Sequence, residues 1–541
     1  MSDCPSEGKP DTRAFLKRYR LLFVAGLVMT MLVARSSYAQ ESPPQTAAPP
    51  SATAQSGTQA SVATVTCASN VGERMNCPAD TSAGVALVRT TGPAACLLGR
   101  TWGYDQTSVW VSDGCGGEFV LGQTAAATAP VTLPTGPRTP AERIESWGEF
   151  EPGDGFLVGR SSAGELSISA YALMRYVNQT PGTQTFTDHL GNTRTIDGRN
   201  DLFPHRVMVF LKGWLATEKL VYTLFVWTVN TTDQDALFGS IGYQFNRKFS
   251  LYAGINGTPG TRSLQGSHPY WLGHDRVMAD EFFRPYFAYG TWAQGEVAPG
   301  LWYNAVTANN SSSLGIKASQ LDRMWSTGAS VWWMPTTREF GPRGGYGDWE
   351  MHEKVATRFG FSSTQSREER FTDADTGATG NTTIKLADSL NVFDIGALAP
   401  GVTVQRVDYR ILSFDAGMKY RGIFLQTEIY TRWLNDFVAD GPLPVTSILD
   451  RGFYVQAAFF PVPKKLELYG ATSQIFGDTD AGFDDSSEYL VGMNFYPADT
   501  RNHRLNFQVI DVNRSPVSST FGYYVGGQTG TTYTTAFSVF F

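Results

Sequence analysis

The amino-acid sequence predicts an all-β protein, a 16-stranded antiparallel transmembrane β-barrel with a small, disulfide-stapled N-terminal periplasmic domain. Three observations lead to this expectation. The last eleven residues alternate between a largely aromatic face and a small, polar one. Sixteen segments with the same period of two follow one another from about residue 165 to the end of the sequence. Beyond residue 39 no apolar run approaches the length of a membrane helix, and the mean hydropathy is -0.20.

The first element is a secretory signal peptide, predicted over residues 1–39. Basic residues from Lys17 to Arg20 precede a largely apolar run at 21–34, and the small residue Ala39 precedes the expected cut. A run of about fourteen apolar residues is too short to span a bilayer comfortably, so a retained anchor is the weaker interpretation. A lipoprotein signal is weaker still, because no cysteine lies at the cut.

Two linkers and a cysteine-containing domain come next. Residues 40–62 form a Pro/Ala/Ser/Thr-rich linker that we expect to be disordered, and residues 123–150 form a second linker. The domain between them, 63–122, holds Cys67, Cys77, Cys96 and Cys115. An even number of cysteines in a short exported segment predicts two disulfides, in one of three pairings. Zinc is the alternative, but spacings of 10, 19 and 19 contain no Cys-x-x-Cys motif, so we expect no metal.

The words around these cysteines are distinctive. Trp102-Gly-Tyr-Asp and Gly114-Cys-Gly-Gly-Glu-Phe resemble a small four-cysteine domain of exported bacterial proteins, a family of unknown function. The resemblance covers about residues 65–121 and implies a fold unit without a chemistry. Trp102, Tyr104 and Trp110 could line a groove for carbohydrate or peptidoglycan, but aromatic side chains in so small a domain more often form its core.

The barrel is expected over residues 151–541. Its strands are predicted at 165–177, 204–214, 219–231, 236–246, 248–256, 284–296, 300–309, 327–337, 352–363, 403–420, 422–435, 451–461, 465–477, 486–496, 503–514 and 531–541. Connections after odd-numbered strands are long and those after even-numbered strands are short, which is typical of an outer-membrane barrel with both termini in the periplasm. The eighth connection, 338–351, breaks this pattern because it is long.

The closing strand carries an assembly signal in this prediction. Phe541, Val539 and Phe537 share one face, and small or polar residues dominate the other. A final strand that ends on Phe resembles the closing strand of Gram-negative outer-membrane barrels, in which the terminal aromatic residue is part of the signal read by the barrel assembly machinery. The alternative is an ordinary edge strand of a β-sandwich.

Residue parity within the strands predicts which charges face the lumen. A charge on the lipid face costs about 2–4 kcal/mol near the midplane, so charged faces are expected to point inward. The residues assigned to the lumen on this basis are Arg175, Lys354, Arg358, Arg406, Arg410, Arg432 and Arg504. Guanidinium groups suit permeating anions, because they keep their charge and match phosphate or carboxylate oxygens. The alternative for any one arginine is a pairing with lipopolysaccharide, Asp408 or Glu428.

The barrel resembles a known family. The segments Gly239-Ser-Ile-Gly-Tyr-Gln-Phe-Asn-Arg247 and Tyr489-Leu-Val-Gly-Met-Asn-Phe-Tyr496, together with the strand pattern, are similar to the phosphate-selective porin O and P family over about residues 150–541. The resemblance implies a porin with lumenal arginines and lysines that favour phosphate, but no arginine ladder aligns residue by residue.

The connection after the fifth strand is the candidate constriction. In sixteen-stranded porins the third external loop, which follows strand five, folds into the lumen and sets its width. The corresponding segment, 259–285, is rich in charged and aromatic residues, and its candidates for the anion path are Arg262, His268, His274, Arg276 and Arg284. The alternative is a loop folded over the mouth of the barrel.

The function expected from these features is passive diffusion of small hydrophilic solutes through an outer-membrane porin, with a preference for anions such as phosphate. We expect a homotrimer in contact with outer-membrane lipid and lipopolysaccharide, and no cofactor. The net charge of -7 argues against a nucleic-acid partner. One alternative is a barrel that presents a cell-wall-binding or adhesion module, which would bind peptidoglycan. A barrel hydrolase is the weaker alternative, because none of the six histidines stands beside a serine except in Ser267-His268.

Overall fold

The computed structural model describes residues 64–121 except 83, and residues 155–541 except 230–233, 267, 286, 311–325, 371–383 and 519–521. The chain divides into two compact units, Met1–Leu133 and Pro134–Phe541, which are treated separately below. The predicted signal peptide and both predicted linkers lie outside the described residues. Within the described ranges, no helix combines the length and the apolar character needed to cross a membrane.

The N-terminal unit consists of two small antiparallel sheets. Its strands are β1 (Thr64–Ala68), β2 (Arg74–Pro78), β3 (Val85–Thr90), β4 (Trp102–Tyr104), β5 (Ser108–Ser112) and β6 (Gly116–Leu121). One sheet has the order β1-β6-β3 and the other β2-β5-β4. The prediction of two disulfides is confirmed, and the pairing left open by the sequence is Cys67–Cys77 and Cys96–Cys115.

The aromatic residues of this unit differ in their surroundings. Trp102 is buried and its ring lies 5.0 Å from that of Phe119, among Val109 and Val111. Tyr104 is exposed, and the half-buried Trp110 has the guanidinium of Arg74 4.0 Å above its ring. Trp102 therefore belongs to the core of the unit.

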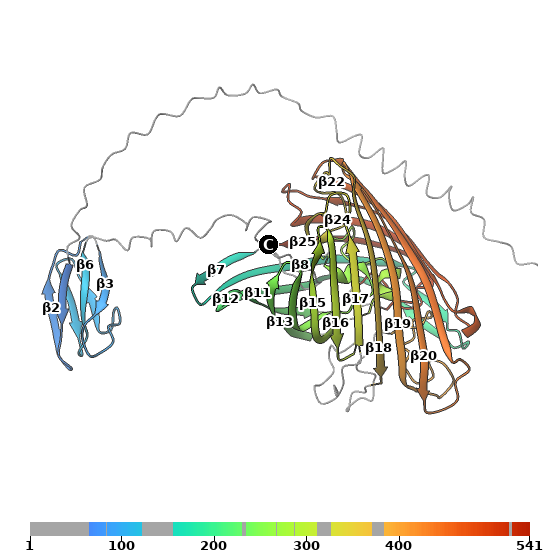
Figure 1. The fold of residues 1–541 in the computed structure, drawn as a ribbon, viewed down its shortest axis with the longest axis horizontal. Coiled ribbons are helices and arrows are strands. Elements are labelled where there is room, and N and C mark those ends of the chain that lie inside the picture. Colours follow the sequence, from blue (N-terminus) through green and yellow to red (C-terminus); the bar gives the residue numbers. More distant parts are fainter. Residues whose placement is uncertain are drawn as a thin grey trace, which may run out of the picture. The chain divides into compact units, whose positions relative to one another are not determined.

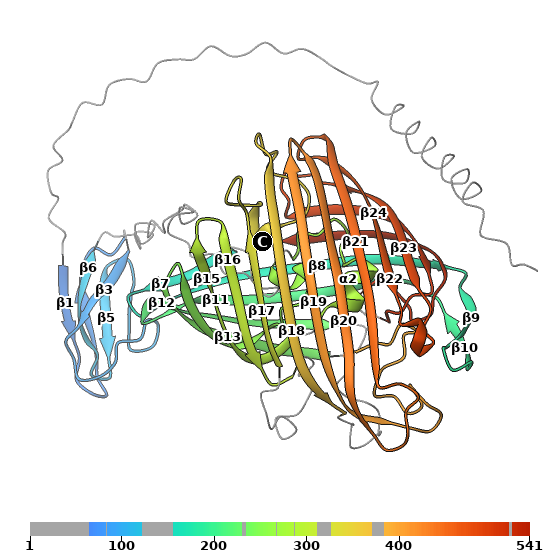
Figure 2. The same ribbon diagram turned by 45° about the vertical axis from the view of Figure 1, so that its right-hand side comes forward.

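The C-terminal unit is a closed antiparallel barrel of sixteen long strands, as predicted (Figures 1 and 2). Its strands are β8 (Gly164–Thr180), β11 (Asn200–Leu215), β12 (Thr217–Val229), β13 (Gln234–Asn246), β14 (Phe249–Gly257), β15 (Phe287–Ala298), β16 (Leu301–Ala308), β17 (Ser326–Trp333), β18 (Ala356–Glu369), β19 (Val404–Tyr420), β20 (Ile423–Ala439), β21 (Ser447–Val462), β22 (Leu466–Phe476), β23 (Ser486–Phe495), β24 (His503–Asn513) and β25 (Gly530–Phe540). Each strand pairs with its neighbours in sequence, and β25 closes the barrel on β8.

The seam of the barrel contains one additional strand. β7 (Phe156–Ser161) forms a hairpin with the start of β8, and β25 pairs with the rest of β8 on the same side. Phe541 lies where the two meet, because its backbone N–H and C=O both bond to Ala170 and its ring lies 5.1 Å from that of Phe156. β7 and β25 thus share one position in the wall.

The two mouths of the barrel differ. Short turns such as Arg247–Lys248 and Arg421–Gly422 form one end, called here the turn mouth, and the longer connections form the other, called the loop mouth. The first long connection carries a hairpin of β9 (Thr183–Thr187) and β10 (Thr193–Asp197) that the sequence analysis missed.

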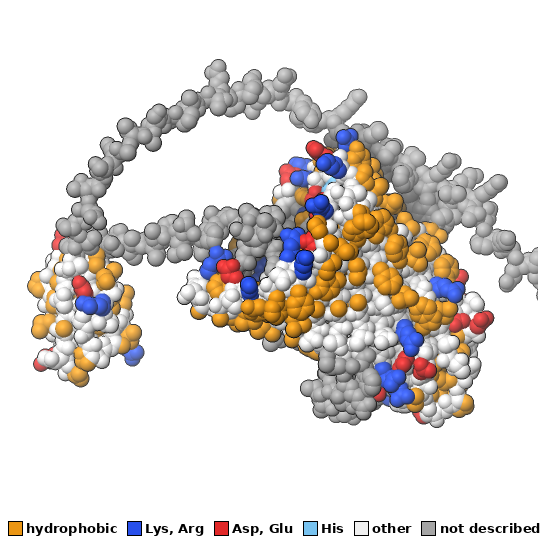
Figure 3. All heavy atoms as spheres, in the orientation of Figure 1, with side chains coloured by type: hydrophobic (Ala, Val, Ile, Leu, Met, Phe, Trp, Pro, Cys, Tyr) orange, Lys and Arg blue, Asp and Glu red, His pale blue; other side chains and the backbone are white. Residues whose placement is uncertain are grey.

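The outer wall is apolar, and the inner wall carries buried polar and charged side chains together with a buried apolar cluster that includes Ile411, Leu434 and Ile510. Exposed outward side chains include Phe361 on β18, Phe414 on β19 and Ile429 on β20. In Figure 3 hydrophobic side chains spread over the outside of the barrel, and charged side chains gather toward its ends. An apolar exterior around a polar interior is what a strand barrel needs in order to stand in a bilayer.

Candidate functional site in the barrel lumen

The connection between β14 and β15 folds into the barrel rather than over its mouth. This segment, residues 258–285, is called the inward loop; it contains the 3-10 turn η1 (Arg262–Gln265) and the helix α2 (Met278–Phe283), which Figure 2 shows inside the barrel. Backbone N–H groups of the loop donate to lumenal side chains of the opposite wall. Arg262 donates to Glu428 Oε1 at 2.8 Å, and Met278 donates to Glu488 Oε2 at 2.8 Å. These bonds give otherwise unsatisfied loop N–H groups a partner.

Wall side chains also donate to carbonyl groups of the inward loop. Arg504 bonds to the carbonyl of Trp271, to that of Gly273 at 3.1 Å and to His274 Nδ1 at 2.9 Å. Tyr409 Oη donates to the carbonyl of Phe283 at 3.0 Å. The inward loop is therefore bound along the wall from β19 to β24, and the lumenal side chains there are buried.

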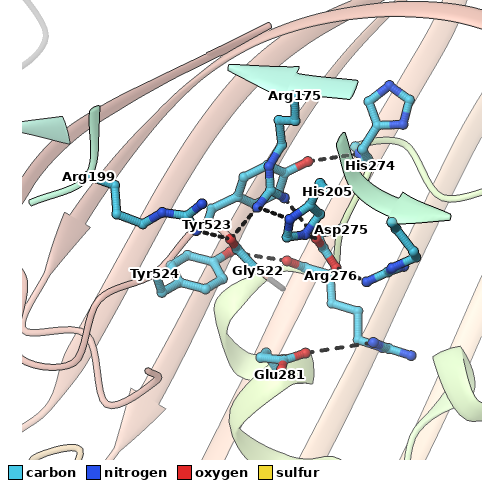
Figure 4. Close-up of polar contacts among 12 residues, drawn as sticks. Arg175, Arg199, His205, His274, Asp275, Arg276, Glu281, Gly522, Tyr523 and Tyr524 are labelled. Carbon is cyan, nitrogen blue, oxygen red and sulfur yellow. Dashed lines mark hydrogen bonds and ion pairs between the residues drawn. The ribbon is translucent and has the colours of Figure 1, made fainter. Parts of the chain in front are cut away.

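A cluster around Asp275 fixes the middle of the inward loop (Figure 4). Asp275 accepts from Arg175 Nη1 at 2.9 Å and from Arg206 Nη2 at 3.4 Å, and His205 Nε2 lies 3.7 Å away. Arg175 also donates to the carbonyl of Gly522 at 2.7 Å. Burial raises the pKa of Asp275, but the two arginines and the histidine outweigh it and hold this pKa below its ordinary value.

Several buried carboxylates are each shared by two basic groups. Asp275 is the first. Asp415 lies 3.0 Å from Arg358 Nε and 3.9 Å from Arg262 Nε. Glu281 lies 2.7 Å from Arg284 Nη2 and 3.7 Å from Arg276 Nη1. Each of these three carboxylates therefore has two basic side chains as neighbours.

A second acid on the inward loop behaves differently. Asp280 accepts a hydrogen bond from Ser263 Oγ at 2.9 Å. Burial raises the pKa of Asp280 to about 6, although Arg276 and this hydrogen bond oppose the change. Asp280 therefore takes up a proton at a higher pH than an exposed aspartate does.

A second segment enters the barrel from the turn mouth. It is the long connection between β17 and β18, residues 334–355, which appeared in the sequence only as a break in the loop pattern. Tyr346 is buried, its N–H donates to the carbonyl of Tyr270 at 2.7 Å, and its ring lies 4.1 Å below the guanidinium of Arg262. Gly347 has a φ of +74, and a Cβ at this position would collide with Glu467. The two segments thus meet inside the barrel from opposite ends.

Three residues of the turn-mouth segment could bring metal ligands together. One ligand atom from each of Asp348, Glu350 and His352 lies within 4.8 Å of the others. His352 is already bonded on both sides, to Asp348 and, at 2.9 Å, to Glu339. Glu350 lies 3.6 Å from Lys419 and 3.7 Å from Arg501. Basic groups therefore already occupy this cluster.

On the part of the wall that the inward loop does not bind, uncharged polar side chains face the lumen. Ser250, Gln294, Asn304 and Ser330 stand directly opposite one another on β14, β15, β16 and β17. All four are buried, and within the described part of the chain Ser250 Oγ, Gln294 Oε1, Asn304 Oδ1 and Ser330 Oγ have no hydrogen-bond partner. This set is called the polar row. No sequence pattern predicts the polar row, because only the strand register brings the four residues together.

Aromatic pairs flank the polar row. Tyr252 and Trp292 stack on the loop-mouth side, with ring centroids 5.3 Å apart and planes 6° from parallel. Trp302 and Trp332 lie on the turn-mouth side, with centroids 6.4 Å apart and planes also 6° from parallel. Rigid aromatic side chains on both sides fix the position of the polar row.

The remaining sequence-predicted residues fall into two groups. Arg175, Arg358, Arg432 and Arg504 face the lumen and are buried, as are His268 and His274 of the inward loop. Burial, followed by nearby arginines, holds the pKa of both histidines well below the ordinary value, so they are neutral.

Three assignments to the lumen were wrong. Lys354 precedes β18 and is exposed, because this strand begins at Ala356 and not at 352. Arg406 and Arg410 lie on the outer face of β19, on the same side as the exposed Leu412 and Phe414.

Comparisons with known proteins concern the two units separately. Residues 54–145 match a family described as "Protein of unknown function (DUF3011)", which confirms the resemblance of the four-cysteine segment to a family of unknown function. Among curated proteins no sequence matches the chain.

Solved structures similar to the chain include outer-membrane proteins. They include OmpT of Vibrio cholerae (TM-score 0.42, 11% identity, covering 71% of this chain and 99% of that one) and an anion-selective porin from Comamonas acidovorans (0.41, 11%, 70% and 100%). OprB of Pseudomonas putida has a TM-score of 0.37 and 9% identity, covering 70% and 94%. The closed 16-stranded barrel of this chain follows from its own strand pairing.

Proposed function

We propose that the chain is an outer-membrane porin that lets small hydrophilic solutes diffuse passively, with a preference for anions such as phosphate. The observation that carries this proposal is a closed barrel with an apolar exterior (Figure 3) and buried charged side chains in its interior, into which the inward loop folds. We include in the proposal a homotrimer and a four-cysteine unit on the periplasmic side.

The preference for anions is supported by the contacts of the inward loop. Asp275, Asp415 and Glu281 are each shared by two basic groups. Glu428 and Glu488 on the wall instead accept hydrogen bonds from backbone N–H and tyrosine hydroxyl groups. Because the interior carries both signs, we expect a moderate preference and not exclusion of cations.

The conducting path in this proposal runs between the inward loop and the polar row. The wall from β19 to β24 is bonded to the loop, so solute passing there would have to break those bonds. The polar row offers hydroxyl and amide groups that have no protein partner within the described residues. A small displacement of the loop would let water and solute satisfy them.

Reversal potentials test the selectivity. We expect single channels in planar bilayers to show a reversal potential of the sign for anion preference in a chloride gradient, and the same sign in a phosphate gradient. A cation-selective channel, or an inserted barrel without conductance, would contradict the proposal.

A cross-link tests the path. Gln265 Nε2 on the inward loop lies 2.7 Å from Ser362 Oγ on β18, so in the double variant Q265C/S362C oxidation in the presence of a short dithiol should tie the loop to the wall through two disulfides. We expect oxidation to lower conductance strongly and a reductant to restore it. The matched control is V331C/F361C, which pairs two neighbouring wall strands on the outer face and leaves the loop and the polar row unchanged. Equal conductance of the oxidised and reduced loop variant would show that passage does not need the loop to move.

A further inference from the structure

Three arginines on the outside of the barrel have no partner among the residues that the structure describes. Arg406 and Arg410 lie on β19 and Arg451 on β21, all toward the loop mouth. Arg410 and Arg451 are exposed and Arg406 is half-buried. Their side chains form no ion pair and no hydrogen bond within the part of the chain that the structure describes. Guanidinium groups that are unpaired on an outer wall can bind an anion from outside the protein.

These arginines lie at the edge of the apolar wall. On β19 the outward residues after Arg410 are Leu412, Phe414, Ala416 and Met418. Eight residues from Arg410 to Met418 extend roughly 27 Å along the strand at about 3.4 Å each, or about 20 Å along the membrane normal for a strand tilted by about 40°. The apolar band of such barrels is about 25 Å tall, so the arginines fall at its boundary with the headgroups.

The surroundings distinguish this set from a random surface charge. Arg367, their basic neighbour on β18, is neutralised by Asp408 through bonds of 2.8 and 3.1 Å. Two further carboxylates lie nearby, Glu369 directly opposite Arg406 and Asp436 on β20. Trp433 stands directly opposite Arg410, as aromatic residues often do at the membrane interface.

We propose that Arg406, Arg410 and Arg451 bind the phosphate groups of a phosphorylated glycolipid of the outer leaflet, such as the lipid A moiety of lipopolysaccharide. The inference rests on the outer-membrane location in the proposed function, with the loop mouth outside. Guanidinium groups bind phosphate oxygens in bidentate fashion, and the interaction is stronger where water is scarce. The acyl chains of the same lipid would lie against Leu412 and Phe414.

Thermal stability of the full-length barrel in detergent tests the site. We expect hexa-acylated, bisphosphorylated lipid A to raise the midpoint of the heat-dependent change in gel migration for the wild type. The variant R406Q/R410Q/R451Q should bind lipid A about tenfold more weakly or worse, which removes most of the shift. The matched control K219Q/K248Q/K464Q removes three exposed lysines at the turn mouth and should retain it.

Further measurements show which part of the lipid causes the shift in thermal midpoint. Dephosphorylated lipid A with the same acyl chains should give little stabilisation, and inorganic phosphate should give none. If the triple variant folds poorly, the single variant R410Q in native mass spectrometry should retain fewer bound lipid A molecules than wild type. The proposal is overturned if the arginine variants keep the wild-type shift and lipid count, if dephosphorylated lipid A works equally well, or if inorganic phosphate reproduces the effect.

Conductance of the triple variant should match wild type because these side chains face away from the lumen, so a failed porin proposal would be recognised separately.

Discussion

The carboxylate of Asp275 offers a direct test of how firmly the inward loop is held. The substitution Asp275→Asn keeps the shape of the side chain but removes its charge, which takes from the buried Arg175 and Arg206 the carboxylate that they share. Breaking a buried ion pair by removing one partner costs about 3–5 kcal/mol. We use the lower limit, about 3 kcal/mol, because the Asn oxygen still accepts one hydrogen bond. Since each 1.36 kcal/mol is a factor of ten, the ratio of displaced to docked loop should rise about 100-fold.

Single-channel recording measures this ratio through the time spent in the higher-conductance state. For Asp275→Asn we expect more frequent and longer openings, and a reversal potential shifted toward anions because one negative charge is lost from the interior. The control is Asp201→Asn, since Asp201 pairs with Arg199 two residues away on the chain at 2.8 Å and has no bond to the loop. Wild-type openings, selectivity and thermal stability in a folded Asp275→Asn barrel would refute the view that this ion pair fixes the loop.

Three other predictions concern parts of the chain outside the lumenal strands. The hydrogen bonds that His352 donates to Asp348 and Glu339 raise its pKa to about 9, so its contribution to barrel stability should be complete below pH 6.5 and lost as the pH rises through about 9. Thermal midpoints across this range should fall for the wild type more than for His352→Gln, and equal slopes would contradict the assignment. Reduction of Cys67–Cys77 and Cys96–Cys115 should destabilise the N-terminal unit by roughly 2–5 kcal/mol, and limited proteolysis should detect this while heat-dependent migration of the barrel is unchanged. Deleting Phe541 removes two backbone bonds and a ring contact, so the yield of folded barrel should drop while secretion continues; Phe541→Tyr is the control, and a wild-type yield after the deletion would count against the seam.

The strands were predictable because their signal is local. Lipid on one side and polar groups on the other impose a period of two on each segment, and that pattern is readable without knowing any partner. The wrong lumenal assignments on β19 arose near the membrane boundary, where a charge on the outer face costs less. Arg406 and Arg410 lie at alternate positions with Leu412 and Phe414, so the period of two places all four side chains on the outer face. The prediction instead applied to the whole strand the rule that charges face inward. At the headgroup boundary a charge costs only about 0–1 kcal/mol, so the rule no longer decides.

The interior was less predictable because its contacts join distant residues. The order of the strands and the family resemblance indicated that the segment after the fifth strand folds inward. No local pattern could assign Asp275 to Arg175, which lies 100 residues earlier, or Arg262 to the segment around Tyr346. The polar row likewise depends on strand register, and register is a property of the pairing and not of a single strand.

The seam implies an order of events in folding. β25 reaches β8 across a chain separation of about 350 residues, as in the bond from Thr180 Oγ1 to the carbonyl of Thr531, which spans 351. Pairings of such separation form slowly, because the entropy of closing the chain must be overcome first. β7, by contrast, lies next to β8 in sequence and can form its hairpin early, covering the edge of β8 up to Ile168. The ten residues from Tyr171 to Thr180 then remain as an open edge, and the early hairpin marks where the last strand must start to pair.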